Sequence, residues 1–123
     1  MGGRRRMPFD PARLLAHKDA LGLSAQQVAQ LNALENDAKP GMTAAVRQIK
    51  TERAAIAAGL NAAAPDTVQL KRRYEALQTA AGKAHWARVS ASLKARAVLT
   101  EEQRGKVRGW ADLRDGRWHS KGR

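Results

Sequence analysis

A chain of 123 residues has room for one domain, and its 43% of hydrophobic residues includes only one Phe, one Tyr and three Trp. With 23 Lys and Arg against 11 Asp and Glu, the formal net charge is +12, which favours anionic partners such as nucleic acid, anionic lipid or acidic polypeptide. The absence of Cys excludes a disulfide scaffold and Cys-ligated zinc, and no apolar run is long enough to span a membrane. We therefore expect a soluble chain without membrane insertion, whose thin core of Ala, Leu and Val is supplemented by dimerisation.

Composition divides the chain into three segments. Residues 1–8 are rich in Gly and Arg and are expected to form a disordered leader. Residues 9–115 contain all the predicted helices and are expected to form a single all-α domain. Residues 116–123 are expected to be a frayed basic tail.

One short helix and two long helices are predicted first along the chain. Asp10 is a good N-cap and Pro11 suits the first helical position, so a short helix should begin there and end at Gly22. The two long helices are expected at about Ala25–Leu60 and Thr67–Ala97, because apolar residues recur there mostly at steps of three and four. The apolar stripes include Val46 and Leu60 on the first long helix and Tyr74, Trp86 and Leu93 on the second.

The two long helices should form an antiparallel hairpin that turns at Asn61–Pro65. Pro40 predicts a kink near residues 37–39 rather than a break, since the apolar stripe continues in phase across it. A layer of two such helices buries only one side of each, so the other side meets water or another chain. Between Lys39 and Val98, eleven basic residues face three acidic ones, which places much of the positive charge on the hairpin.

The same short sequence motif occurs at both ends of the hairpin, once at the start of the first long helix and once just after the second. Leu23-Ser24-x-x-Gln27 and Leu99-Thr100-x-x-Gln103 are both capping boxes, in which the hydroxyl and the Gln side chain cap each other's backbone N–H groups. The second copy opens a short closing helix. A short helix, a long hairpin and a closing helix give four predicted helices.

With both copies of this motif, the sequence from about Phe9 to Arg114 resembles the LTxxQ family of bacterial envelope proteins, that of Spy and CpxP. The first copy departs from the pattern by Ser for Thr, which keeps the hydroxyl cap. The resemblance implies a periplasmic protein whose export signal has been removed, and an antiparallel dimer shaped like a shallow cradle. It also implies an ATP-independent chaperone that holds unfolded or partly folded clients. The six motif residues then fix helix starts and the joint between the terminal helices, and they do no chemistry.

Client contacts are expected on the long helices, where charge and apolar surface alternate. The predicted charged contacts are Arg47, Lys50, Arg53, Arg72, Arg73, Lys83 and Arg88. The predicted apolar contacts are Met42, Ile49 and Trp86. Each of these residues is otherwise explained as an ordinary surface charge or core side chain.

A second branch of this family, of the CnrX and ZraP type, binds or senses metal. Its sensor pattern has a His-x-x-x-His pair, a nearby Glu and a His-x-x-x-Met pair. Here the position four residues after His17 is Leu21, and the position four residues after His85 is Val89, so both second ligands are missing. His17, Glu35 and His85 remain the three candidate ligands. No cofactor is expected apart from an adventitious divalent metal.

Other functions have less support in the sequence. No nucleophile with a base, no phosphate-binding loop and no paired acids indicate an enzyme. Nonspecific nucleic-acid binding is the alternative from another class, because Lys71-Arg72-Arg73 is basic, but no recognition-helix motif indicates a specific nucleic-acid partner. Regulation of a sensor kinase, as in the CpxP branch, also stays open. The sequence does not identify the clients or the inducing stress.

Overall fold

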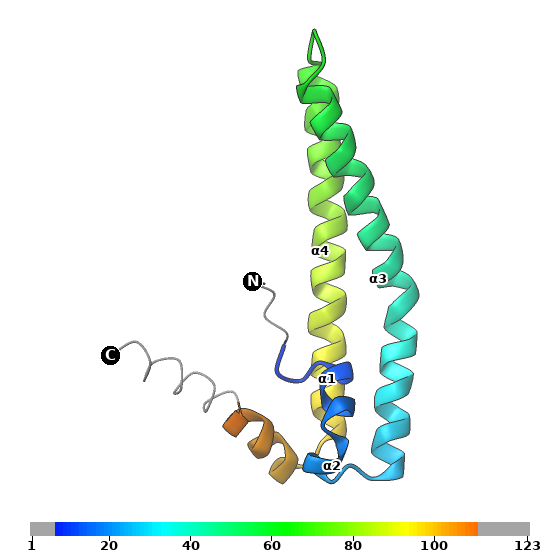
Figure 1. Ribbon diagram of the computed structural model, residues 1–123, viewed down its shortest axis with the longest axis vertical. Helices are drawn as coiled ribbons and strands as arrows, with labels where there is room; N and C mark the ends of the chain where they lie inside the picture. The colour runs from blue at the N-terminus through cyan, green and yellow to red at the C-terminus, as the bar shows by residue number, and fades with distance from the viewer. Residues whose placement is uncertain (1–6, 111–123) are drawn as a thin grey trace, which may run out of the picture. The chain divides into compact units, whose positions relative to one another are not determined.

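The structure is a computed structural model that describes residues 7–110, and over that range it is all-α, as predicted (Figure 1). The described residues form the helices α1 (Pro11–Ala16), α2 (Lys18–Leu21), α3 (Ala25–Leu60) and α4 (Thr67–Val98), and a closing helix at residues 101–110. The two long helices match their predicted ranges to within one residue. Most of the predicted leader and all of the predicted tail lie outside the described residues.

The predicted first helix is interrupted at His17, so two short pieces replace one. The backbone N–H of His17 is shared between the carbonyl oxygens of Arg13, at 3.2 Å, and Leu14, at 3.1 Å, with φ −110° and ψ 27°. Helices this short have few backbone hydrogen bonds to keep them regular. Both outer ends form as predicted: Asp10 accepts a hydrogen bond from the Arg13 N–H at 3.3 Å, and Gly22 adopts φ 66°.

The chain divides into two compact units. Within the described residues, the base unit comprises residues 7–37 and 88–110, and the hairpin unit comprises Ala38–Ala87. The base unit contains the buried core cluster. Each of the four labelled helices and the closing helix contributes one residue to it, and Leu99 lies between α4 and the closing helix. The members of the cluster are Leu14, Leu21, Leu31, Ala95, Leu99 and Val107. These small and medium apolar residues fit the thin core predicted from composition.

The hairpin unit holds the loop-side halves of α3 and α4 and the turn that joins them. α3 runs without a break through Pro40, as predicted, and the kink stays a prediction. Asp66 caps the start of α4 by accepting a hydrogen bond from the Gln69 N–H at 3.1 Å. A Cβ on Gly59 would lie 2.5 Å from Leu70 Cδ2, so the missing side chain lets Leu70 approach the α3 backbone.

The apolar stripes of the long helices are only partly buried. Leu31 is fully buried, whereas several other members of the predicted stripes are largely exposed: Val46 (48%), Leu60 (65%), Tyr74 (54%), Trp86 (62%) and Leu93 (58%). Periodicity identifies the helices correctly but does not say which stripe residues a single neighbouring helix can cover. No helix among residues 7–110 is long and apolar enough to cross a membrane.

Candidate functional site

The two capping boxes form as the sequence predicts. In the first, the Gln27 N–H donates to Ser24 Oγ at 3.1 Å and the Ser24 N–H donates to Gln27 Oε1 at 2.9 Å. In the second, the Gln103 N–H donates to Thr100 Oγ1 at 3.2 Å and the Thr100 N–H donates to Gln103 Oε1 at 2.8 Å. Each box therefore caps two backbone donors at the start of a helix.

The two Gln side chains also bond to each other, which no capping box by itself predicts. Gln27 Nε2 donates to Gln103 Oε1 at 2.7 Å, and Gln103 Nε2 donates to Gln27 Oε1 at 3.2 Å. The remaining donor capacity goes to backbone carbonyls: Gln27 Nε2 bonds to Val98 O at 3.0 Å, and Gln103 Nε2 to Leu21 O at 3.2 Å. We call this paired arrangement the motif joint. It connects the ends of α2 and α4 to the starts of α3 and the closing helix.

Arg104 strengthens the same region and was not among the predicted residues. Its guanidinium donates to the carbonyl of Arg96 at 3.2 Å and to that of Leu99 at 2.9 Å, and it forms an ion pair with Glu101 at 2.7 Å. The last carbonyls of a helix lack partners within the helix, so Arg104 caps the C-terminus of α4. Its position four residues after Thr100 was the available signal, but a lone Arg in a basic chain is not distinctive.

The hairpin unit is strongly basic. It carries eight basic side chains against three acidic ones, a balance of +5. Five of the predicted client-binding cations lie in this unit and are exposed: Arg47, Lys50, Arg53, Arg72 and Lys83. Arg88 is also exposed but belongs to the base unit. Of the predicted apolar contacts, Trp86 is 62% exposed, whereas Met42 and Ile49 are half-buried.

Arg73 differs from the other predicted contact cations, because it is paired with a buried acid. Its Nη1 lies 3.4 Å from Glu52 Oε1, and the Glu52 side chain is only 7% exposed. Gln48 donates to the other carboxylate oxygen of Glu52 at 3.1 Å. Because a buried carboxylate needs compensation, Arg73 has a structural role between α4 and α3. The sequence grouped it with the exposed cations, since the burial of Glu52 leaves no local pattern.

We expect Arg73→Gln to lower the free energy of unfolding by about 1–2 kcal/mol, because it leaves the Glu52 carboxylate with Gln48 and no cation. The neighbouring change Arg72→Gln removes the same charge from an exposed site and should change stability by less than about 0.5 kcal/mol. Urea denaturation followed by circular dichroism measures both. Equal stability of the two variants would contradict a structural role for Arg73.

Exposed apolar side chains accompany the charges of the hairpin unit. Besides Trp86, they are Val46, Leu60, Val68 and Tyr74, each about half exposed or more. Three of these four residues, Val46, Leu60 and Tyr74, lie on the predicted apolar stripes, whereas Val68 does not. The hairpin unit therefore presents separate apolar side chains among exposed cations, a surface suited to many weak contacts.

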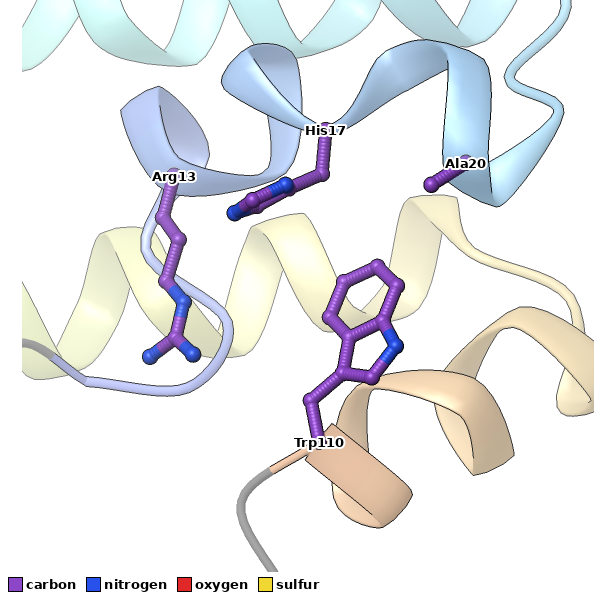
Figure 2. Close-up of a pocket in the computed structure, with 4 residues that line it drawn as sticks. All are labelled: Arg13, His17, Ala20 and Trp110. Carbon is purple, nitrogen blue, oxygen red and sulfur yellow. The ribbon is translucent and has the colours of Figure 1, made fainter. Parts of the chain in front are cut away.

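The three candidate metal ligands do not form a metal site in the described residues. His17 is exposed and lies against Trp110, with ring centroids 5.1 Å apart and the planes tilted by 55° (Figure 2). The two rings line a pocket of about 390 Å³ together with Arg13 and Ala20. Glu35 belongs to the base unit and His85 to the hairpin unit. Within residues 7–110, no three His, Asp or Glu side chains are grouped so as to hold a metal ion.

Comparison with known proteins gives one match. A family model described as heavy-metal resistance matches residues 1–106 of the chain. Neither the curated proteins nor the solved structures provide a match. The match covers both copies of the Leu-Ser/Thr-x-x-Gln motif up to Lys106, and it confirms the family resemblance that these copies predict.

Proposed function

Since the chain belongs to the heavy-metal resistance family, within the Spy/CpxP/ZraP superfamily of periplasmic helical proteins, we propose that it is an ATP-independent periplasmic chaperone of the Spy type. The observation that carries this proposal is the surface of the hairpin unit. The formal net charge of this unit is +5, and its exposed Arg and Lys side chains lie among separate exposed apolar side chains.

This surface suits capture and release without an energy source. Long-range attraction by the cations speeds encounter with clients that carry acidic segments. Isolated apolar side chains such as Val46, Tyr74 and Trp86 each bury little area, so each contact is weak and dissociates readily. A client can therefore be held against aggregation and still leave to fold.

An aggregation assay tests the proposal. A chemically denatured model client is diluted into buffer with and without this protein, in the absence of ATP, and light scattering is recorded. We expect scattering to fall in proportion to added protein, and the effect to weaken as salt is raised, since the Debye length is about 10 Å at 0.1 M and shorter above it. A lysozyme control of similar charge separates capture from nonspecific coating. No suppression at low salt would reject the chaperone proposal.

The family description favours a second candidate, a metal-binding or metal-sensing protein of the CnrX or ZraP type. The residues present do not fit a resident metal, because the position four after His17 is the buried Leu21 and the position four after His85 is Val89. Neither side chain supplies a ligand atom.

We therefore predict that the protein does not bind zinc, nickel or copper stoichiometrically with sub-micromolar affinity. Titration calorimetry on the full chain measures this, with His17→Ala and His85→Ala as comparison variants. Tight binding that disappears in either variant would favour the metal-binding candidate over the chaperone.

We also propose that the protein is a homodimer formed through the long helices, in the antiparallel cradle that the family resemblance implies. Exposed stripe residues of the long helices that are not assigned to client contact, such as Leu93, are available for such an interface. Light scattering coupled to size exclusion at micromolar concentration should give twice the chain mass of 13.4 kDa. A mass of one chain across the concentration range would contradict it.

A further inference from the structure

The loop end of the hairpin unit differs in character from the rest of it. Residues 54–65 contain no charged side chain, although the hairpin unit as a whole carries eleven charged residues. The uncharged stretch consists of Ala, Gly, Ile, Leu, Asn and Pro, and it includes the last turns of α3 and all of the connection to α4 except Asp66 (Figure 1). A connection between two helices in a strongly basic protein is ordinarily polar.

This loop end is also fully accessible. Every residue from 60 to 69 is exposed. Leu60 and Val68, which flank the turn on α3 and α4, are each 65% exposed and are the most exposed of the large hydrophobic side chains in the described residues. Between them lie Ala62, Ala63, Ala64 and Pro65, together with the polar Asn61 and Thr67 and the single charge of Asp66, so the extreme end of the hairpin is a small, mostly apolar surface.

Basic side chains lie directly behind this apolar end. Lys71 and Arg72 follow Val68 at three and four residues, which places all three on one side of the first turns of α4, and both cations are exposed. On α3, Arg53 precedes Leu60 by seven residues and lies on the same side of that helix, about 10 Å further from the turn. Asp66 is the only acid near the turn, and its carboxylate caps the Gln69 N–H.

We propose that the loop end of the hairpin docks on the surface of an anionic lipid bilayer. In a bilayer leaflet the anionic headgroups lie outside the acyl chains, so a docking protein meets them in that order from water. Apolar side chains at the tip, with Lys and Arg about one turn behind, match this order of depth. Leu60 and Val68 enter the boundary with the acyl chains, while Lys71 and Arg72 remain among the headgroups.

The observations favour lipid over the other anionic partners. Nucleic acid would satisfy Lys71 and Arg72, but it offers no apolar phase to a tip made of Leu60, Val68 and three Ala residues. The tip docks and does not cross, because no helix in residues 7–110 is long and apolar enough to span a membrane. This inference goes beyond the proposed chaperone function and is independent of it, since an aggregation assay contains no lipid.

A vesicle sedimentation experiment with the full chain tests the proposal. Large vesicles of equal parts phosphatidylglycerol and phosphatidylcholine are compared with vesicles of phosphatidylcholine alone. We expect the protein to sediment with the anionic vesicles at low salt, to be released by high salt, and to stay in solution with the neutral vesicles. Absence of binding to the anionic vesicles at low salt would overturn the proposal.

Paired variants separate docking by the tip from attraction by net charge. Lys71→Gln/Arg72→Gln should weaken binding by about tenfold or more, whereas Arg47→Gln/Lys50→Gln removes the same charge elsewhere in the hairpin unit and should weaken it much less. The apolar pair Leu60→Ser/Val68→Ser should likewise weaken binding by about tenfold, with Val46→Ser as the exposed apolar control. Equal losses in the variant and control of either pair would contradict tip docking.

The absence of Cys allows a direct test of which end enters the lipid. Ala63→Cys and Thr43→Cys are each labelled with an environment-sensitive fluorophore, and both positions are exposed, so neither label should disturb the fold. On anionic vesicles the label at position 63 should shift to the blue and the label at position 43 should not. The reverse pattern, or no shift at position 63 while the protein is bound, would show that another surface holds the lipid.

Discussion

Gln103→Glu is expected to lower the free energy of unfolding by about 2–4 kcal/mol, although Glu is an accepted residue at this position of a capping box. The substituted side chain keeps its shape and can still cap the Thr100 N–H. It loses, however, both N–H donors that reach Leu21 O and Gln27 Oε1. A carboxylate would then face these oxygens at a site where Gln103 is 7% exposed.

The pH dependence of the loss identifies its cause. The introduced carboxyl is charged less readily in the folded state than in the unfolded chain, so its pKa is raised on folding. The loss should therefore be small below the unfolded pKa of about 4.3 and should grow as pH rises through and above it. Urea denaturation across this pH range measures the effect at a fixed protein concentration. Glu102→Gln, at the exposed neighbouring position, is the matched control. A pH-independent loss would mean that the missing N–H donors, and not the charge of the introduced carboxylate, are responsible.

Replacing Arg47, Lys50, Arg53 and Arg72 together by Gln is expected to slow client capture by about tenfold or more at low salt, while the helices remain folded. These four cations are exposed, and among residues 7–110 none of them has an ion pair in the structure. Exposed charges contribute little to stability individually. Arg73 is left unchanged, because its removal would leave the buried Glu52 carboxylate without a cation and lower stability. A loss of client capture could then not be separated from a loss of folded protein.

Stopped-flow mixing with a fluorescent, denatured client measures the capture rate. The difference between the variant and the parent should shrink as salt rises, and it should be larger for an acidic client than for a neutral one. Circular dichroism checks that the variant keeps its helix content. Unchanged capture of both clients at low salt by a folded variant would show that the basic surface is an ordinary solvated face.

Helix positions were predictable from the sequence because their signals are local. A side-chain oxygen caps the backbone N–H group three residues further on at four helix starts, those of Asp10, Ser24, Asp66 and Thr100. Gly22 adopts the left-handed conformation at the end of α2. Such contacts depend only on neighbouring residues. The break at His17 was not predicted, because the residues around His17 do not distinguish one continuous short helix from two shorter helices.

The contacts between distant segments were not predictable in the same way. The pairing of Gln27 with Gln103 spans 76 residues, and that of Arg73 with Glu52 spans 21. Each of these residues has a complete local explanation, as a capping residue or a surface charge, so the local pattern predicts neither pairing. For the two Gln residues, only the family resemblance implied a joint between the terminal helices. Leu99 is similar: as part of a motif it is expected to pack beside a helix start, but the structure buries it to 2% in the core cluster. On that burial, its removal affects the core as well as a helix end.

The motif joint also has a consequence for the order of folding. The hairpin connects segments that are close in the sequence, so its closure costs little chain entropy and can occur early. The joint connects residues 71 to 82 positions apart, and its hydrogen bonds can form only once the intervening helices have brought the two ends of the described chain together. The contacts of the joint are therefore expected to be absent from the folding transition state and to govern the unfolding rate instead. Weakening Gln103 should accelerate unfolding while leaving the refolding rate nearly unchanged.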